Sequence, residues 1–305
     1  MNINFKAILK YIKYFYIAVI IPFLLYFLWD ARDFLGILYD EADYHWLAIA
    51  LVFWCVSHLV SPLLPFLIFD RKISRVTYSE MLEIHISMLP ARYIPGGIWH
   101  TVGRVMCYRG LSIPAPLIAK FLVMENALAV FVTFLLGCSL LLLSPSPIAS
   151  NILVLILILA AIAIVFFGKL LSIFSKGQVL SNSRYFLCVL VVTLFWIAAV
   201  FSFMGFFSGV SVIPENLGGL GLAGAYLISW GIGFVSIFAP QGIGVFEYIL
   251  SFFLNEDGFD SKVFVLVACF RLIVLAADFI TFLIGYVLSC NVRRLVLFTS
   301  EKESA

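Results

Sequence analysis

Residues 95–98 read Pro-Gly-Gly-Ile, and residues 240–243 read Pro-Gln-Gly-Ile. Each motif interrupts a long apolar stretch, the first at about 79–110 and the second at about 219–254. Proline removes a backbone hydrogen-bond donor and glycine loosens a helix, so we expect each stretch to form two half-helices that meet at a turn. At membrane depth, such a break is tolerated only where protein buries it or where it lines a wet cavity.

The rest of the chain is too apolar for a water-soluble protein. Of its 305 residues, 64% are hydrophobic and 12% are charged, whereas an average soluble domain has roughly 45–50% and about 25%. A transmembrane helix needs about 20 apolar residues. Six unbroken segments meet or nearly meet this length: about 14–29, 46–69, 115–143, 151–167, 185–207 and 263–289. The composition therefore predicts an all-α polytopic membrane protein without an appended soluble catalytic domain.

The charged residues predict how the chain is oriented. If each broken stretch is a re-entrant hairpin that returns to the side it entered from, one side holds 15 Lys and Arg residues and the other holds two, with nine acids. Lys and Arg concentrate in cytoplasmic loops. We therefore predict six crossings of the inner (cytoplasmic) membrane, one hairpin entering from each side, and both termini in the cytoplasm. The N-terminal apolar run has a basic start but no small-residue cleavage site, which predicts an uncleaved first span.

A second pair of matching segments indicates an internal repeat. Residues 133–137 read Thr-Phe-Leu-Leu-Gly, and residues 281–285 read Thr-Phe-Leu-Ile-Gly. The separation between these two segments is nearly the same as that between the two Pro-Gly motifs. Each half, 1–147 and 148–290, then reads span, span, broken hairpin, span, followed by a cytoplasmic tail at 291–305. Three crossings per half invert the second half, as in secondary transporters whose interrupted helices mark the binding site. Chance matches in an apolar sequence are the alternative explanation.

Five charged residues fall inside the predicted helices: Lys120, Glu125, Glu247, Arg271 and Asp278. A charge near the bilayer centre costs about 2.5–3.5 kcal/mol on insertion scales, so it needs a partner or a wet cavity. Glu125 and Arg271 are separated by the repeat offset, and we expect them to face each other or a shared cavity; the alternative is an ion pair that only locks the halves together. Arg271 and Asp278, two turns apart, could line one stripe, whereas Lys120 can snorkel to the cytoplasmic surface.

The half-helices after the two breaks are suited to binding an anion. A helix N-terminus presents free N–H groups and a partial positive charge. Arg92, His100 and Arg104 flank the first break on the cytoplasmic side and give a positive mouth for an anionic head group. Glu247 lies in the first turns after the second break, where capping the helix dipole is its alternative role.

The remaining histidines and the cysteines give no indication of a metal site. His58 and His85 sit singly in apolar surroundings, which favours hydrogen-bonded structural roles. The six cysteines also lie singly, without a CxxC or a Cys/His cluster at metal spacing. We therefore predict no metal and no cofactor. The net charge of +2 gives no indication of nucleic acid as a partner.

Five elements recur in one known family: residues 92–98 (RYIPGGI), Gly103-Arg104, Met124-Glu125-Asn126, residues 240–247 (PQGIGVFE) and Arg271. Together they resemble the lysylphosphatidylglycerol synthase transmembrane region, the flippase-like domain family, over most of the chain. The family pattern usually has a second glycine after the proline and a Glu-Arg pair, where this chain has Gln241 and Asn126. The resemblance implies a stand-alone member, without the aminoacyltransferase domain, that moves a polar-headed lipid between leaflets. That lipid would be an anionic or aminoacylated phospholipid, or a polyprenyl-phosphate-linked lipid.

The leading interpretation is a lipid flippase rather than an enzyme, with a membrane lipid as substrate and with a second copy or envelope-biosynthesis proteins as possible partners. Two alternatives stay open. One is a membrane glycosyl or phosphoryl transferase whose metal is held by acids of the first outer loop, Asp30, Asp33, Asp40, Glu41 and Asp43; the other is a non-catalytic scaffold. The candidate substrate-binding residues are Arg92, Pro95, Gly96, Gly97, His100, Arg104, Glu125, Pro240, Gly242, Gly244, Glu247, Arg271 and Asp278.

Overall fold

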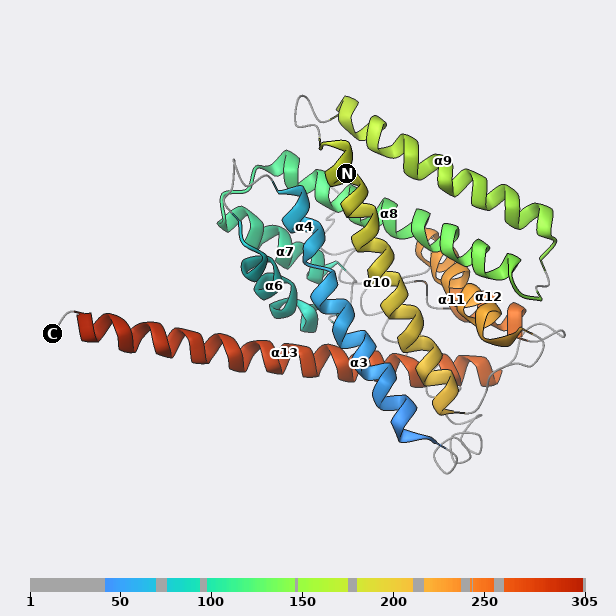
Figure 1. Ribbon diagram of the computed structural model, residues 1–305. Coiled ribbons are helices and arrows are strands. Elements are labelled where there is room, and N and C mark those ends of the chain that lie inside the picture. The colour runs from blue at the N-terminus through green and yellow to red at the C-terminus, as the bar shows by residue number, and fades with distance from the viewer. Residues whose placement is uncertain are drawn as a thin grey trace, which may run out of the picture.

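The fold is that of a helical bundle, seen in a computed structural model (Figure 1). The structure describes residues 42–69, 76–93, 98–145, 148–174, 180–210, 217–236, 242, 244–254 and 261–303. Within these ranges the regular elements are all helices. The predicted first span at 14–29 lies outside the described residues, as do Pro95, Gly96, Gly97 and Pro240.

The helices follow one another with short connections. In chain order they are α3 (Tyr44–Val60), α4 (Leu63–Ile68), α6 (Tyr78–Ser87), the 3-10 helix η1 (Leu89–Tyr93), α7 (Trp99–Gly110), α8 (Ala115–Leu142), α9 (Ser150–Phe174), α10 (Asn182–Gly209), α11 (Gly218–Val235), α12 (Val245–Leu254) and α13 (Ser261–Glu303).

Six helical segments in the described part of the chain are long and apolar enough to cross a bilayer. They are Tyr44–Ile68, Ala115–Leu142, Ser150–Leu170, Asn182–Gly209, Gly218–Val235 and Lys262–Leu288. Five of them coincide with predicted spans, which confirms a multi-pass, all-helical membrane protein. The sixth differs from our expectation: α11 was predicted as half of a broken hairpin, yet its 18 residues suffice for a crossing by length and composition.

Local sequence signals explain where several helices begin. Thr77 and Glu80 form a capping box at the start of α6, in which the Thr77 backbone N–H donates to Glu80 Oε2 over 2.7 Å. Asp43 caps α3 by accepting the His45 N–H at 2.9 Å. Pro62 directly precedes α4, and Ser61 is the residue after α3, so the predicted span 46–69 is two helices rather than one.

Small residues bring two helix pairs close together. Gly205 and Gly209, four residues apart on α10, face α3, and a Cβ on Gly205 would lie 3.1 Å from the Ala50 backbone nitrogen. Gly224 of α11 approaches α8 in the same way, because its Cβ would lie 2.9 Å from the Gly137 carbonyl oxygen. In lipid, such contacts replace the hydrophobic driving force that packs helices in water. The central helix pairs are therefore α3 with α10 and α8 with α11.

The two remaining long helices lie at the margins of the bundle. In Figure 1, α9 lies beside α8 at the edge, and most of its side chains from Ser150 to Leu170 are exposed. α13 crosses α3 and packs against α6, η1 and α12, and its C-terminal part extends beyond the other helices (Figure 1). Its 43 residues run as one helix to Glu303, so the predicted tail at 291–305 continues the last span as helix up to that residue.

Candidate functional site

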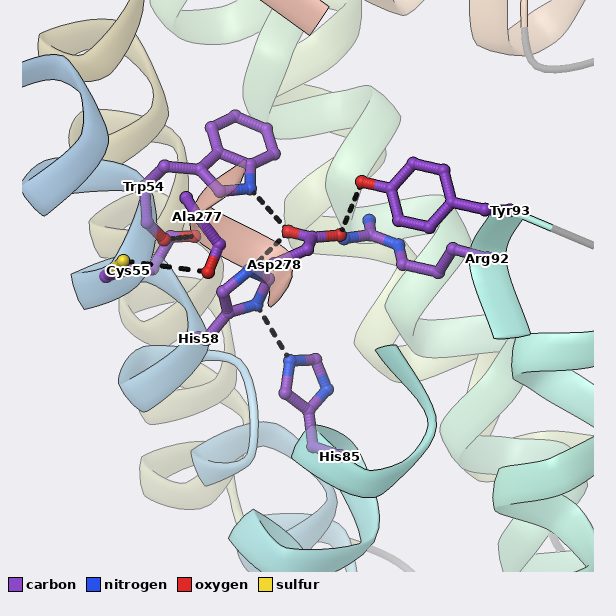
Figure 2. A network of polar contacts seen from close by, with 9 residues as sticks. Trp54, Cys55, His58, His85, Arg92, Tyr93, Ala277 and Asp278 are labelled. Carbon is purple, nitrogen blue, oxygen red and sulfur yellow. Dashed lines mark hydrogen bonds and ion pairs between the residues drawn. The ribbon is translucent and has the colours of Figure 1, made fainter. Parts of the chain in front are cut away.

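Asp278 is the centre of a buried polar network between α3, η1 and α13 (Figure 2). Its Oδ1 accepts the Trp54 indole N–H at 2.9 Å and contacts His58 Nε2 at 2.7 Å. Its Oδ2 accepts from Arg92 Nη1 at 3.1 Å and from the Tyr93 hydroxyl at 2.9 Å. The side chain of Asp278 is 1% exposed, and four partners offset the cost of burying its charge.

Two histidines continue this network toward the first hairpin (Figure 2). His58 Nδ1 lies 3.1 Å from His85 Nε2. Because His58 Nε2 donates to the carboxylate, a neutral His58 has a bare Nδ1, and His85 Nε2 is then the donor between the rings. The ring of His100 stands edge-on to that of His85, with centroids 5.9 Å apart. Three imidazoles thus lead from Asp278 toward α6 and α7.

Burial sets the protonation state of the hairpin histidines. Burial first, and then the positive charges around it, lowers the pKa of His85 well below its usual range. The same causes lower the pKa of His100, with Arg104 as the main neighbouring charge. Both rings are therefore neutral around pH 7. The Nε2 of His100 is buried without a hydrogen-bond partner among the described residues.

A bidentate ion pair borders the histidines. Arg104 Nη1 and Nη2 donate to Glu125 Oε1 and Oε2 over 2.7 and 2.8 Å. Arg104 comes from α7 and Glu125 from α8, and the guanidinium also lies 5.3 Å from the ring centroid of Phe121. The Arg104 side chain is 5% exposed and that of Glu125 26%. The pair therefore holds a fully buried cation beside a carboxylate that keeps some exposure.

A second ion pair joins α12 to α13. Arg271 Nη2 lies 2.7 Å from Glu247 Oε1, while Glu247 Oε2 accepts the Gly244 backbone N–H at 2.7 Å. Here the carboxylate side chain is 5% exposed and the arginine 40%. Glu247 therefore caps the N-terminus of α12, which was the alternative role predicted for it, and it also pairs with Arg271.

The turn before α12 depends on two glycines. Gly242 and Gly244 have φ values of +70° and +88°, which L side chains rarely adopt. A Cβ on Gly242 would also lie 2.9 Å from the Gly233 carbonyl carbon at the end of α11. The turn can pack against α11 because Gly242 lacks a side chain, whereas Gly244 is required only by its positive φ.

The structure corrects three sequence expectations. Glu125 and Arg271 pair with Arg104 and Glu247, so they are not partners of each other; α7 contacts α8, and α12 contacts α13. Arg271 and Asp278 lie two turns apart on α13 but bind different helices. Lys120 is 7% exposed rather than extended to the surface, because α10 covers that face of α8.

Sequence reasoning missed the network's other members. Trp54, His58, His85 and Tyr93 were not candidates, and the two histidines were expected to be isolated. They are hydrogen-bonded, as expected, but to each other and to Asp278 rather than singly. One signal was available: Trp54 and His58 are four residues apart, so they share one face of an otherwise apolar helix.

Of the five acids of the first outer loop, Asp30, Asp33, Asp40 and Glu41 lie outside the described residues. The carboxylate of the fifth, Asp43, caps α3. Among the described residues, no group of three or more His, Cys, Asp or Glu side chains is arranged to hold a metal ion. Compared with known proteins, the chain matches no family model and no curated protein significantly.

Proposed function

We propose that the protein is a stand-alone lipid flippase of the flippase-like, lysylphosphatidylglycerol synthase transmembrane type, which moves a lipid with an anionic head group between leaflets. The observation that carries this proposal is the network around Asp278. Buried charges in a membrane protein mark the path of a substrate or an ion. Arg92 is the exposed edge of that network, with 37% of its side chain accessible. An arginine fork suits a phosphate group.

The packing of the helices supports an inverted repeat as the basis of transport. Under the repeat, α3 corresponds to α10, and these two pack against each other. The third spans correspond as α8 and α13, and each packs against the first half of the other repeat's hairpin: α8 against α11, and α13 against α6. This reciprocal pattern is what a pseudo-two-fold axis generates.

The repeated Thr-Phe-Leu motif supports the same correspondence at the level of residues. A Cβ on Gly137, in the first copy, would lie 2.9 Å from Ile228 of α11. A Cβ on Gly285, in the second copy, would lie 2.7 Å from Ile86 of α6. Each motif glycine thus packs against an isoleucine from the hairpin of the other repeat. Chance repetition of an apolar pentapeptide gives no reason for equivalent contacts.

The two ion pairs also occupy corresponding places. Each joins the second half-helix of a hairpin to the third span that follows it: Arg104 to Glu125, and Glu247 to Arg271. The charges are reversed between the halves. Both pairs tie a hairpin to its own half, so the halves can rock against each other as units.

In this proposal the head group meets Arg92 at the edge of the Asp278 network, and rocking of the halves exposes it to the other leaflet. The site lies on the cytoplasmic side if the Lys and Arg distribution orients the chain as predicted, with both termini inside the cytoplasmic membrane. The acyl chains stay in lipid, so only the head group needs a polar path.

Leaflet exchange in proteoliposomes tests the proposal. Purified protein is reconstituted with fluorescently labelled phosphatidylglycerol, and the label exposed in the outer leaflet is quenched over time. We expect exchange faster than in empty vesicles, and at least a tenfold loss of that acceleration in Asp278→Asn. Glu83→Gln, an exposed acid of α6, is the matched control and should exchange like the wild type. Wild-type exchange no faster than in empty vesicles, for anionic and for polyprenyl-phosphate lipids, contradicts the proposal.

A further inference from the structure

The chain of imidazoles behind Asp278 connects the carboxylate to the first hairpin by hydrogen bonds. Asp278 Oδ1 to His58 Nε2 is 2.7 Å, and His58 Nδ1 to His85 Nε2 is 3.1 Å. Both nitrogens of His58 are engaged, one by an acid and one by a second base. A ring held in this way can accept a proton on one side while it gives one up on the other.

The groups around Asp278 define what competes for its carboxylate. The carboxylate is faced by Trp54 and His58 from α3, and by Arg92 and Tyr93 from η1. Arg92 is the only guanidinium among these four partners. If an anionic head group draws Arg92 away, the carboxylate loses its permanently charged partner while its side chain stays 1% exposed. A buried carboxylate in that state gains strongly from binding a proton.

His85 has charged neighbours of its own. His58 of α3 faces it directly, His100 and Arg104 of α7 lie close to it, and Glu125 of α8 neutralises Arg104. These surroundings keep the ring neutral at rest. A neutral ring is ready to relay a proton because its free nitrogen, Nδ1, is unprotonated.

We propose that Asp278 takes up one proton through His85 and His58 when an anionic head group engages Arg92, so that each head group is moved together with a proton. The inference rests on the proposed lipid transport. It adds that the transported species is electrically neutral as a whole.

The proton transfers balance without any further reactant. A proton binds the lone pair of His85 Nδ1, and the proton on His85 Nε2 passes to His58 Nδ1. The proton on His58 Nε2 then passes to Asp278 Oδ1. The carboxylate becomes neutral, and both rings end neutral with their tautomers reversed. When the head group leaves on the other side of the membrane and Arg92 returns, Asp278 gives up its proton to that side, and each ring turns over so that its N–H again points toward the carboxylate.

The relay makes a prediction that lipid movement alone does not. With one proton per singly charged head group, a gradient of one pH unit should enrich labelled phosphatidylglycerol about tenfold in the leaflet on the alkaline side. A membrane potential should leave its distribution unchanged. Uncoupled movement of the anion would instead respond to the potential, by about fiftyfold per 100 mV, and not to the pH gradient.

Proteoliposomes with either a pH gradient or a potassium diffusion potential distinguish these outcomes. Enrichment by the pH gradient alone supports the relay. Exchange that responds only to the potential, or that gives no enrichment at all, overturns the relay and leaves the flippase proposal standing. Absence of any exchange overturns both.

A variant pair locates the proton path. His85→Gln should lose the enrichment by the pH gradient, because glutamine cannot be protonated, and any exchange that remains should respond to the membrane potential instead. Glu83→Gln, two residues away on the exposed face of α6, should keep the full response. An unchanged response in His85→Gln would remove His85 from the path and overturn the proposal. If His85→Gln does not fold, the wild-type response to the two gradients still decides.

Discussion

The two ion pairs of the bundle share a place in the architecture but differ in burial and in sign. Arg104–Glu125 buries its cation beside the histidines, whereas Glu247–Arg271 buries its carboxylate at the start of α12 and leaves its arginine half-exposed. The buried member of the second pair has a backbone N–H as a further partner. In the described part of the chain, Glu125 is the only carboxylate paired with the guanidinium of Arg104. The first pair should therefore be far more sensitive to loss of one partner.

Glu125→Gln should be the most destabilising change at either pair. It leaves the Arg104 charge buried without a counter-charge, and breaking a buried pair in this way costs about 3–5 kcal/mol. Thermal unfolding of the detergent-solubilised protein measures the effect as a lowered Tm. The double variant Arg104→Gln with Glu125→Gln should recover part of the loss, because the uncompensated charge is gone. If it recovers nothing, the cost does not come from the stranded guanidinium.

Gly242→Ala should cause the second-largest loss of stability, and it should affect only the second repeat. The alanine would need φ near +70° and would place its Cβ 2.9 Å from the Gly233 backbone. Backbone strain alone costs about 1–2 kcal/mol, and the clash adds to it. Gly244→Ala is the matched control, because φ is +88° there but nothing lies within 4 Å. Equal losses of stability in the two variants would show that the approach of the turn to α11 is not tight.

Arg271→Gln should have the smallest effect on stability. Its side chain is 40% exposed, and Glu247 keeps the Gly244 N–H after the substitution. Ion pairs between exposed groups contribute about 0–1 kcal/mol; Glu247 is buried but keeps the Gly244 N–H as a partner, so the loss of Tm should stay well below that of Glu125→Gln. A drop in Tm as large as that of Glu125→Gln would contradict the asymmetry between the pairs.

The sequence predicted the helical class and five of the spans because apolar length is a local property. It also placed Arg104, Glu125, Glu247 and Arg271 among the candidates, since charges inside apolar helices stand out. It paired them incorrectly because the Arg104–Glu125 contact depends on how α7 folds back on α8. The histidine network was missed because His58 and His85 are 27 residues apart and meet only through the packing of α3 against α6.

The position of a bound head group tests the central claim most directly. The full-length protein in nanodiscs containing phosphatidylglycerol can be imaged at a resolution that shows phosphate groups. The account predicts phosphate density within hydrogen-bond distance of the Arg92 guanidinium, beside Asp278 and between the two halves. Lipid density confined to the outer face of α9 and the other exposed helices, with Arg92 still bound to Asp278, would contradict it.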